Sequence, residues 1–352
     1  MAKAILVTGG AGFIGSNFVP YFCRKHPEYL VIVLDKLTYA GNIDNLHECQ
    51  GLINYAFIHG DICDSALINN IFASYNISGI IHFAAESHVD NSITGPKAFV
   101  DTNIVGTFNL LQAANLYWME KPHQVRKGCE HCRFHHISTD EVYGSLGAQG
   151  LFTEQSPYAP NSPYSASKAS SDMLVRSYFH TYGLNVTTSN CSNNYGPKQH
   201  PEKLIPKTIY NCLHQMPIPI YGKGNNIRDW LYVQDHCEAI DLIFHQGKAG
   251  ETYNVGGNNE VDNLTLVTNI CRYLDHLCPR ANGERYEDLI CHVEDRAGHD
   301  FRYAIDSSKI KQELGWQPAF SFDKALKSTI LWCIQNMMHW YLNSASLGNL
   351  VS

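Results

Sequence analysis

The sequence predicts an α/β fold: a doubly wound, parallel Rossmann sheet with a smaller α/β domain that binds substrate. At about 150 residues per domain, 352 residues correspond to about two domains. Up to residue 195, short β-branched runs alternate with longer amphipathic stretches, which is typical of strand–helix–strand units. Beyond that point prolines cluster and the alternation ends. We therefore expect domains at residues 1–195 and 196–342, with some exchange of segments, and a flexible tail at 343–352.

Six runs are predicted to be strands of the first domain. They are nearly continuous in apolar residues, as expected for parallel strands covered on both faces, and comprise residues 4–8, 30–35, 55–59, 79–84, 133–138 and 185–190. Helical periodicity predicts helices over residues 103–119 and 163–182 in the first domain. In the second domain it predicts helices over residues 263–277 and 322–342.

The composition excludes several classes of protein. Asp and Glu outnumber Lys and Arg by 33 to 26, a net charge of −7, whereas a general nucleic-acid binder needs a basic surface. No apolar run approaches the roughly 18 residues of a membrane span, and the N-terminal apolar stretch is too short for a signal peptide. The 12 cysteines are scattered, which favours reduced thiols and a cytoplasmic location.

A glycine loop follows the first predicted strand. Gly9, Gly12 and Gly15 form G-x-x-G-x-x-G where that strand meets the first helix. The first glycine of such a loop permits the tight turn, the second lets the backbone approach a pyrophosphate, and the third lets the helix pack on the strand. The phosphates would lie at the helix N-terminus, where free N–H groups favour anions. A glycine triplet alone is a weak signal, so the prediction depends on its surroundings.

An acidic residue ends the second predicted strand. Asp35 lies 20 residues after Gly15, where a carboxylate can bind the ribose 2′-hydroxyl of a dinucleotide. It would repel a 2′-phosphate, so the sequence predicts NAD rather than NADP. Asp61 and Ile62, after the third strand, are expected to flank the adenine. The alternative for Asp35 is a helix cap or a solvated loop acid.

Tyr164 and Lys168 form a Tyr-x-x-x-Lys pair on a predicted helix. Positions i and i+4 share one helix face, and Ser162 with Pro163 predicts the helix start. A lysine ammonium beside a tyrosine stabilises the phenolate, so we expect it to lower the phenol pKa and make Tyr164 a base near neutrality. The spacing also occurs by chance in many helices, and it gains weight here from the glycine loop.

Two adjacent acids and a hydroxyl follow the fifth predicted strand. Ligands bind at the carboxyl ends of the strands in a doubly wound sheet, so Thr139, Asp140 and Glu141 are expected in the cleft. Two carboxyl groups there predict an acid–base pair, provided that their surroundings separate the two pKa values. The alternative is an ordinary surface turn.

These motifs together resemble the extended short-chain dehydrogenases/reductases that act on nucleotide sugars, and among them the 4,6-dehydratases. The resemblance extends from about residue 3 to residue 340. Its further motifs are DKLTYAGN at 35–42, AAESHVD at 84–90, STDEVYG at 138–144, SNNYGP at 192–197, EKLIP at 202–206, PIYGKG at 219–224, RDW at 228–230 and DRAGHD at 295–300. Thr-Asp-Glu is the discriminating triplet, because related 4-epimerases usually lack the acid pair.

The resemblance implies a hydro-lyase with tightly bound NAD. Tyr164, assisted by Thr139, would take the proton of the sugar C4 hydroxyl while hydride passes from C4 to NAD⁺, and Lys168 would orient the nicotinamide ribose. Glu141 would remove the C5 proton and Asp140 would protonate the departing C6 hydroxyl. Return of hydride to C6 gives a 4-keto-6-deoxy sugar and regenerates NAD⁺. The implied substrate is dTDP-glucose, in deoxysugar biosynthesis such as that of rhamnose, with UDP-glucose as an alternative.

Two sets of binding residues are implied by the same resemblance. The cofactor set is Gly9, Gly12, Phe13, Ile14, Gly15, Asp35, Lys36, Leu37, Thr38, Asp61, Ile62, Phe83, Ala84, Ala85, Ser87, Thr102, Tyr164, Lys168 and Asn194. The substrate set is Ser87, Thr139, Asp140, Glu141, Asn193, Lys203, Leu204, Pro219, Tyr221, Lys223, Arg228, Asn263, Asp295, Arg296 and His299. Guanidinium groups suit diphosphate oxygens, which favours Arg228 and Arg296 for that role. Ala297 departs from the family, which commonly has proline there.

Other readings remain open at this point. A 4-epimerase or a UDP-glucuronate decarboxylase would share the fold, although Asp140 and Glu141 argue against both. A non-catalytic NAD sensor would not need Tyr164 and Lys168, so the presence of both residues argues against that alternative. Cys129-x-x-Cys132 lies among histidines, but no second cysteine pair has matching spacing, so no metal is expected. The resemblance also implies a homodimer in which the helix around residues 105–117 and the Tyr164 helix form a four-helix bundle. Nucleic acid and membrane are not expected as partners.

Overall fold

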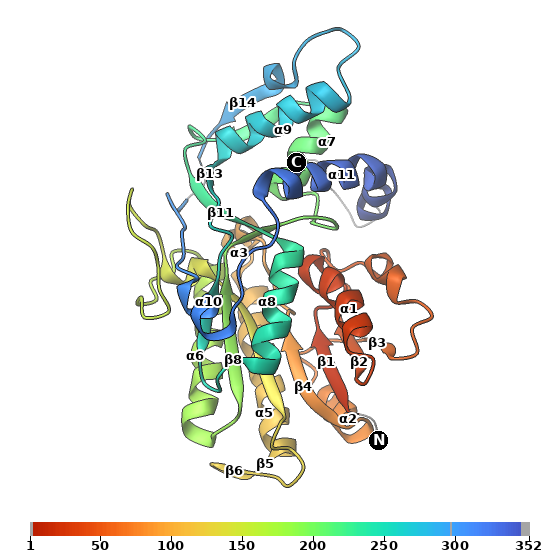
Figure 1. Ribbon diagram of the computed structural model, residues 1–352, viewed down its shortest axis with the longest axis vertical. Coiled ribbons are helices and arrows are strands. Elements are labelled where there is room, and N and C mark those ends of the chain that lie inside the picture. The colour runs from red at the N-terminus through yellow and green to blue at the C-terminus, as the bar shows by residue number, and fades with distance from the viewer. Residues whose placement is uncertain (1–2, 296–297, 346–352) are drawn as a thin grey trace.

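The computed structural model describes residues 3–295 and 298–345, and it describes side-chain contacts up to residue 336. Figure 1 shows a larger part built around a sheet and a smaller, mainly helical part above it. Arg296 and Ala297 lie outside the described residues, as does most of the predicted tail.

Seven parallel strands form the large sheet, in the order β12-β8-β7-β4-β1-β2-β3. Along the chain they are β1 (Ala4–Thr8), β2 (Leu30–Asp35), β3 (Tyr55–His59), β4 (Ile77–His82), β7 (Arg133–Thr139), β8 (Val186–Cys191) and β12 (Thr252–Val255). The first three predicted strands are confirmed residue for residue, and the next three to within two residues. The strand order reverses between β1 and β4, the point at which doubly wound sheets bind ligands.

Helices cover both faces of this sheet, which confirms the predicted fold class. On one face, Phe18, Phe22 and Phe244 pack in a single buried cluster that includes residues of α1 (Phe13–Lys25) and α8 (Val233–Gln246). On the other face, a second cluster joins the sheet to α2 (Ser65–Ser74), α5 (Thr107–Trp118) and α6 (Pro163–Tyr182). Both α8 and β12 come from beyond residue 195, so the second half of the chain contributes to the larger part.

Local signals explain why α6 begins and ends as predicted. Ser162 and Ser165 form a capping box, in which the backbone N–H of Ser165 donates to Oγ of Ser162 at 3.1 Å. Pro163 occupies the first turn, where its missing N–H has no cost. Gly183 ends the helix in the left-handed region, at a φ of 73°.

The helix predicted over residues 103–119 differs from expectation. Val100–Gly106 form a π-helical stretch, and α5 follows and ends at Trp118. The wider turn directs Asn103 inwards, where its amide donates to Oγ of Ser167 and accepts from the backbone N–H of Glu86, each at 2.8 Å. An apolar pattern does not distinguish a π turn from an α turn, and such turns are frequent near functional sites.

The smaller part has its own core and two small sheets. One sheet pairs β10 (Ile218–Tyr221) with β14 (Ile290–Val293), and the other contains β9 (Asn193–Tyr195), β11 (Ile227–Tyr232) and β13 (Glu260–Asp262). Its helices are α7 (Leu204–Leu213), α9 (Asn263–Leu277) and α11 (Phe322–Ala345). The prediction for α9 is confirmed residue for residue, and α11 begins where predicted.

The remaining elements are short. They are β5 (Met119–Lys121), β6 (Gln124–Val125), α3 (Val89–Thr94), α4 (Pro96–Phe99), α10 (Ser308–Leu314) and the 3₁₀ turns Ile43–Cys49, Asp140–Tyr143 and Tyr286–Leu289. Within residues 3–295 and 298–345, no helix has the length and apolar character needed to cross a membrane.

Candidate active site

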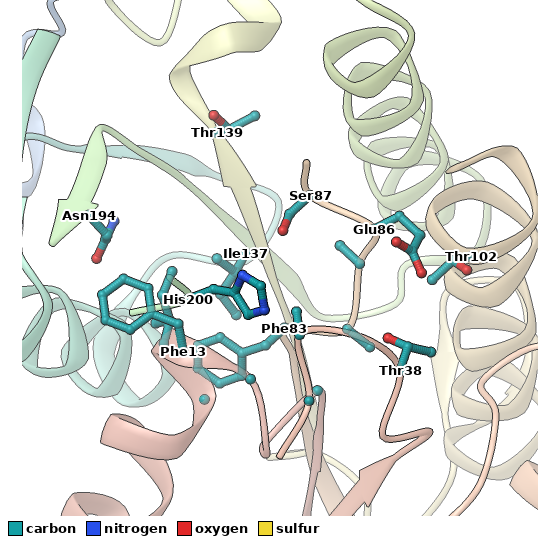
Figure 2. A pocket seen from close by; sticks show the side chains of 18 of the residues that line it. Phe13, Thr38, Phe83, Glu86, Ser87, Thr102, Ile137, Thr139, Asn194 and His200 are labelled. Atoms are coloured by element: carbon teal, nitrogen blue, oxygen red, sulfur yellow. The ribbon is translucent and has the colours of Figure 1, made fainter. Parts of the chain in front are cut away.

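A cavity of about 310 Å³ lies where the loops after β1, β2, β4 and β7 meet residues of the smaller part. Figure 2 shows Phe13, Phe83, Thr102, Thr139 and Asn194 around it. The cavity is therefore at the carboxyl edge of the sheet, beside the point where the strand order reverses.

The glycine loop forms one wall, packed too closely for any side chain. Gly9 has a φ of 72°, and a Cβ there would lie 2.5 Å from the backbone N of Ala84. A Cβ on Gly15 would lie 2.4 Å from the carbonyl oxygen of Gly9. The loop can thus bring its backbone N–H groups and the N-terminus of α1 against a bound anion, as a dinucleotide pyrophosphate requires.

Asp35 lines the cavity and also fixes the glycine loop. Its two carboxylate oxygens accept the backbone N–H groups of Ala11 and Leu37, each at 2.8 Å. Burial raises the pKa of Asp35, and these two donors act against the rise. Each oxygen keeps acceptor capacity beyond these bonds, so a ribose hydroxyl can be bound at the same carboxylate. Nearby, Asp61 lines the cavity and pairs with Lys36 at 2.7 Å.

Tyr164 and Lys168 are both buried and line the cavity. Nζ of Lys168 donates to the carbonyl oxygen of Ile137 at 2.8 Å, which fixes the ammonium beside the end of β7. Burial, and then the charge of Glu141, holds the pKa of Tyr164 well above its usual value, so the expectation of a lowered phenol pKa is wrong for the protein by itself. Burial also lowers the pKa of Lys168, because both groups are desolvated in their charged forms.

The two acids after β7 have different surroundings. Asp140 is 1% exposed, and its Oδ2 has no hydrogen-bond partner among the described residues. Burial, and then the neighbouring Glu141, holds the pKa of Asp140 well above its usual value, which favours its protonated form. Glu141 instead lines the cavity, and its backbone N–H donates to Oγ1 of Thr139 at 3.3 Å. The environment therefore separates the two carboxyl groups, as an acid–base pair requires.

The cavity collects most of the predicted cofactor residues. All of them line it except Leu37, which donates to Asp35 from just outside. Five predicted substrate residues also line it: Ser87, Thr139, Glu141, Asn193 and Lys203.

The other predicted substrate residues do not line this cavity. Asp140 and Arg228 are buried outside it, and Arg296 is outside the described residues; the remainder are Leu204, Pro219, Tyr221, Lys223, Asn263, Asp295 and His299. Arg228 packs its guanidinium 4.3 Å from the ring centre of Tyr303 and donates to the carbonyl oxygen of Asp300 at 3.0 Å. His299 pairs with Asp295 at 2.7 Å, with its ring 6.2 Å from that of Tyr221. These residues form a second group around β10 and β11.

Sequence reasoning missed several acids and histidines of the cavity. Glu86, His200 and Glu202 line it, and Figure 2 shows Glu86 and His200. Burial raises the pKa of Glu202 to about 7, and its carboxylate lies 3.2 Å from Nε2 of His88. The sequence did carry a signal for two of these residues, because Glu86 lies in the AAESHVD motif and Glu202 in the EKLIP motif.

A Rossmann sheet that brings a glycine loop, an acid at the end of β2 and a Tyr-x-x-x-Lys pair into one cavity defines a short-chain dehydrogenase/reductase. The family model described as GDP-mannose 4,6 dehydratase matches residues 6–329, and the chain belongs to that family.

Named relatives cover nearly the whole chain. The dTDP-glucose 4,6-dehydratase of Neisseria meningitidis serogroup B is 53% identical over 341 residues, which is 96% of this chain and 95% of the relative. That of Salmonella typhimurium is 52% identical over 351 residues, 97% and 95% of the two chains. The crystal structure of a dTDP-glucose 4,6-dehydratase from Streptomyces venezuelae, with NAD and TYD bound, has a TM-score of 0.86 at 44% identity and covers 98% of this chain and 100% of its own.

Proposed function

We propose that this protein is an NAD-dependent hydro-lyase that converts dTDP-glucose to dTDP-4-dehydro-6-deoxyglucose and water. One observation carries the proposal: two adjacent acids with different surroundings, a buried Asp140 and a cavity-lining Glu141, follow β7 at the cavity that Tyr164 and Lys168 also line. A 4-epimerase removes and returns one hydride and needs no further acid and base, whereas loss of water needs both. The reaction of the named relatives supports the same conclusion.

NAD fits the cavity on evidence from the protein itself. The close approach of Gly9 to Ala84 leaves backbone, not side chain, to meet a pyrophosphate, and Asp35 supplies an acceptor for the ribose. When bound, NAD accepts a hydride from the sugar C4 and returns it to C6. The predicted cofactor residues that line the cavity are those we assign to its binding, and the NAD-bound relative from Streptomyces venezuelae supports this assignment.

Tyr164 is the base that we assign to the oxidation step. Burial raises its pKa, so the phenol needs help to lose a proton, and a hydrogen bond from Thr139 acts to lower that pKa. Lys168, fixed on Ile137, adds a positive charge on the same helix face. The phenolate takes the proton of the C4 hydroxyl as C4 becomes a ketone.

Asp140 and Glu141 are the pair that we assign to the elimination. The new 4-keto group acidifies the C5 hydrogen, which Glu141 removes from the cavity side. Burial raises the pKa of the Asp140 carboxyl group and so favours its protonated form, and we assign to it the donation of a proton to the departing C6 hydroxyl. Breaking the C6–O bond with both groups in place releases water. Hydride then returns to C6 and a proton to C5.

The two domains would share the substrate. We assign the cofactor and the reacting groups to residues 1–195, and the nucleotide part of the sugar nucleotide mainly to residues 196–342. Lys203 in the cavity supports this division, and the group around Arg228 and His299 offers charge for the diphosphate. The return of α8 and β12 to the larger part is the exchange of segments that the division needs.

A homodimer in the cytoplasm completes the proposal. Four large apolar side chains on the outer faces of α5, α6 and the preceding π turn are at least 40% exposed, namely Val105, Phe108, Leu116 and Met173. Their positions support a four-helix bundle made by α5 and α6 of two copies, because a second copy would remove this apolar area from water. The scattered cysteines support a reducing compartment.

The test is an assay of the purified protein without added NAD. We expect it to convert dTDP-glucose, in preference to UDP-glucose and GDP-mannose, to a 4-keto-6-deoxy sugar identified by NMR and mass spectrometry. Nucleotide extracted from the denatured protein should be NAD. Formation of a 4-epimer with no loss of water would contradict the proposed reaction, and a preference for another nucleotide would contradict the proposed substrate.

A further inference from the structure

A buried polar cluster lies directly behind the Tyr164–Lys168 pair. On α6, Tyr164, Lys168 and Asp172 occupy positions i, i+4 and i+8, so all three lie along one face of the helix. Asp172 is 4% exposed and is absent from the cavity lining, one turn further from the reacting groups than Lys168. A carboxyl group buried at this place has no part in the steps described above.

Three donors converge on the carboxylate of Asp172. Oγ of Ser138 and the hydroxyl of Tyr158 donate to Oδ2 at 2.8 and 3.0 Å, and Nε2 of His136 lies 3.0 Å from Oδ1. Nδ1 of His136 has no partner among the described residues, and burial holds the pKa of this histidine well below its usual value. We therefore assign a neutral ring with its proton on Nε2, which makes His136 a donor to Asp172.

This arrangement suits an ionised carboxylate. A protonated carboxyl group would have to donate from one oxygen, yet donors face both oxygens. Three hydrogen bonds to the charged form stabilise it at a buried position, where burial by itself disfavours a charge. Burial raises the pKa of Asp172 only to about 6, which leaves it ionised at neutral pH.

Lys168 is the positively charged group that acts on the carboxylate of Asp172. Besides Lys168 on its own helix, Asp172 is faced by His136 and Ser138 from β7 and by Tyr158 from the loop before α6. Behind these lie His82 on β4, Tyr143 on the 3₁₀ turn, and Asn190 and Cys191 on β8. Burial lowers the pKa of Lys168, and the charge of Asp172 opposes that change more than any other neighbour does.

We propose that Asp172 is a positioning residue for the oxidation step: its buried carboxylate keeps Lys168 protonated, and through Lys168 it supports ionisation of Tyr164. The catalytic role of Asp172 rests on the proposed function, but the ionisation of Tyr164 can be measured without turnover. Asp172 lies one helical turn from Lys168 and does not line the cavity, so we expect its effect to be electrostatic.

The test follows the phenol of Tyr164 in the NAD-bound protein. The full chain is labelled with [¹³Cζ]tyrosine, the Tyr164 signal is assigned with Tyr164→Phe, and its titration is compared with that of Asp172→Asn. We expect the titration midpoint to rise by about one pH unit in Asp172→Asn, because the loss of the counter-charge lets Lys168 lose its proton. In single turnovers with dTDP-glucose, the rate of NADH formation at pH 7 should fall about tenfold and recover at higher pH.

Two variants separate charge from structure. Asp241→Asn removes a buried carboxylate from α8, which is bound by Lys25 at the end of α1 and by His26 just after that helix. It should leave the Tyr164 titration unchanged. Tyr158→Phe deletes one donor to Asp172 without changing the charge, and should shift the midpoint in the same direction by less. Should Asp172→Asn fail to fold, Tyr158→Phe carries the test.

The outcomes distinguish this inference from the proposed function. An unchanged midpoint in Asp172→Asn, or in Tyr158→Phe where that variant carries the test, overturns the role of Asp172 even if rates fall uniformly with pH. A shifted midpoint in a protein that does not dehydrate dTDP-glucose would support the role of Asp172 and overturn the proposed function instead.

Discussion

The backbone N–H of Ala11 donates to Oδ2 of Asp35 at 2.8 Å, so the acid that ends β2 also holds the glycine loop that follows β1. The N–H of Leu37 donates to the other oxygen at the same distance. One carboxylate therefore fixes two segments of the cavity wall, and a change there should affect both cofactor binding and stability.

Asp35→Ala should release NAD and weaken the fold. The buried N–H of Ala11 and the partly buried N–H of Leu37 lose their acceptor, and a buried group left unsatisfied costs about 1–3 kcal/mol. We expect less NAD in the purified variant and a lower melting temperature, measured by nucleotide extraction and calorimetry. Full NAD occupancy at an unchanged melting temperature would show that Asp35 has neither role.

Tyr164→Phe should slow turnover by roughly 10²–10⁴, the usual contribution of a positioned proton-transfer group. The change removes one hydroxyl and little volume, so NAD content and substrate affinity should stay near the wild-type values. Steady-state kinetics and a binding titration measure these quantities. Tyr253→Phe is the matched control, since that hydroxyl bonds Glu313 instead, and near-normal turnover in Tyr164→Phe would assign the oxidation to another base.

Asp140→Asn and Glu141→Gln should spare the oxidation and slow the elimination. Each keeps the side-chain shape and removes one ionisable group, so NADH should form in a single turnover and then persist, while the overall rate falls by roughly 10²–10⁴. Stopped-flow absorbance follows the NADH.

Isotopes check the same elimination in the unmodified protein. Deuterium placed at C4 of the substrate should reach C6 of the product, and solvent deuterium should appear at C5. If the C4 label exchanges with solvent, or if both variants dehydrate at the normal rate, then Asp140 and Glu141 are not the eliminating pair.

A second cluster should make stability depend on pH. Asp241 on α8 is 3% exposed and lies within 2.9 Å of Lys25, His26 and His245. Although burial raises the pKa of Asp241, hydrogen bonds from His245 and Lys25 hold it well below its usual value. The pKa of His245 is raised, because Asp241 outweighs the effect of burial.

The direction of each pKa shift determines the pH range in which that residue stabilises the fold. The lowered pKa of Asp241 stabilises the fold above about pH 4, and this stabilisation is lost as pH falls further. The raised pKa of His245 stabilises the fold below about pH 6.5, and this stabilisation is lost as pH rises through the pKa of the folded state. Asp241→Asn should therefore lower the free energy of unfolding by about 1–3 kcal/mol near pH 5–6, less than a fully buried pair because Lys25 reaches solvent. Urea unfolding from about pH 2 to about pH 8 measures the difference in the free energy of unfolding, which should narrow below about pH 4 and above about pH 6.5. A constant difference would contradict this account.

If the proposed homodimer forms through α5 and α6, Phe108→Asp should convert it to a monomer. The charge would be buried at the centre of the proposed four-helix bundle, where it has no partner. Analytical ultracentrifugation measures the mass, and Ile53→Asp, at a fully exposed position elsewhere, is the control. An unchanged mass in Phe108→Asp would contradict the proposed dimer contact through α5 and α6.

The sequence by itself determined the local structure and the kind of site. Strand runs, helix periodicity and caps are short-range signals, so β1, β2, β3, α6 and α9 are predicted residue for residue. The glycine loop and Asp35 also follow from a fixed spacing within one strand–helix–strand unit, and nearly all predicted cofactor residues line the cavity.

Only the tertiary structure decided how charged the site residues are and what lies behind them. Burial, which depends on packing between distant segments, raises the pKa of Asp140 and raises rather than lowers the pKa of Tyr164. The inward turn of Asn103, the donors on Asp172 and the place of Arg228 outside the cavity likewise depend on contacts between residues far apart in the chain. Spacing along the chain predicts which groups can meet, whereas desolvation and long-range contact decide their protonation and their partners.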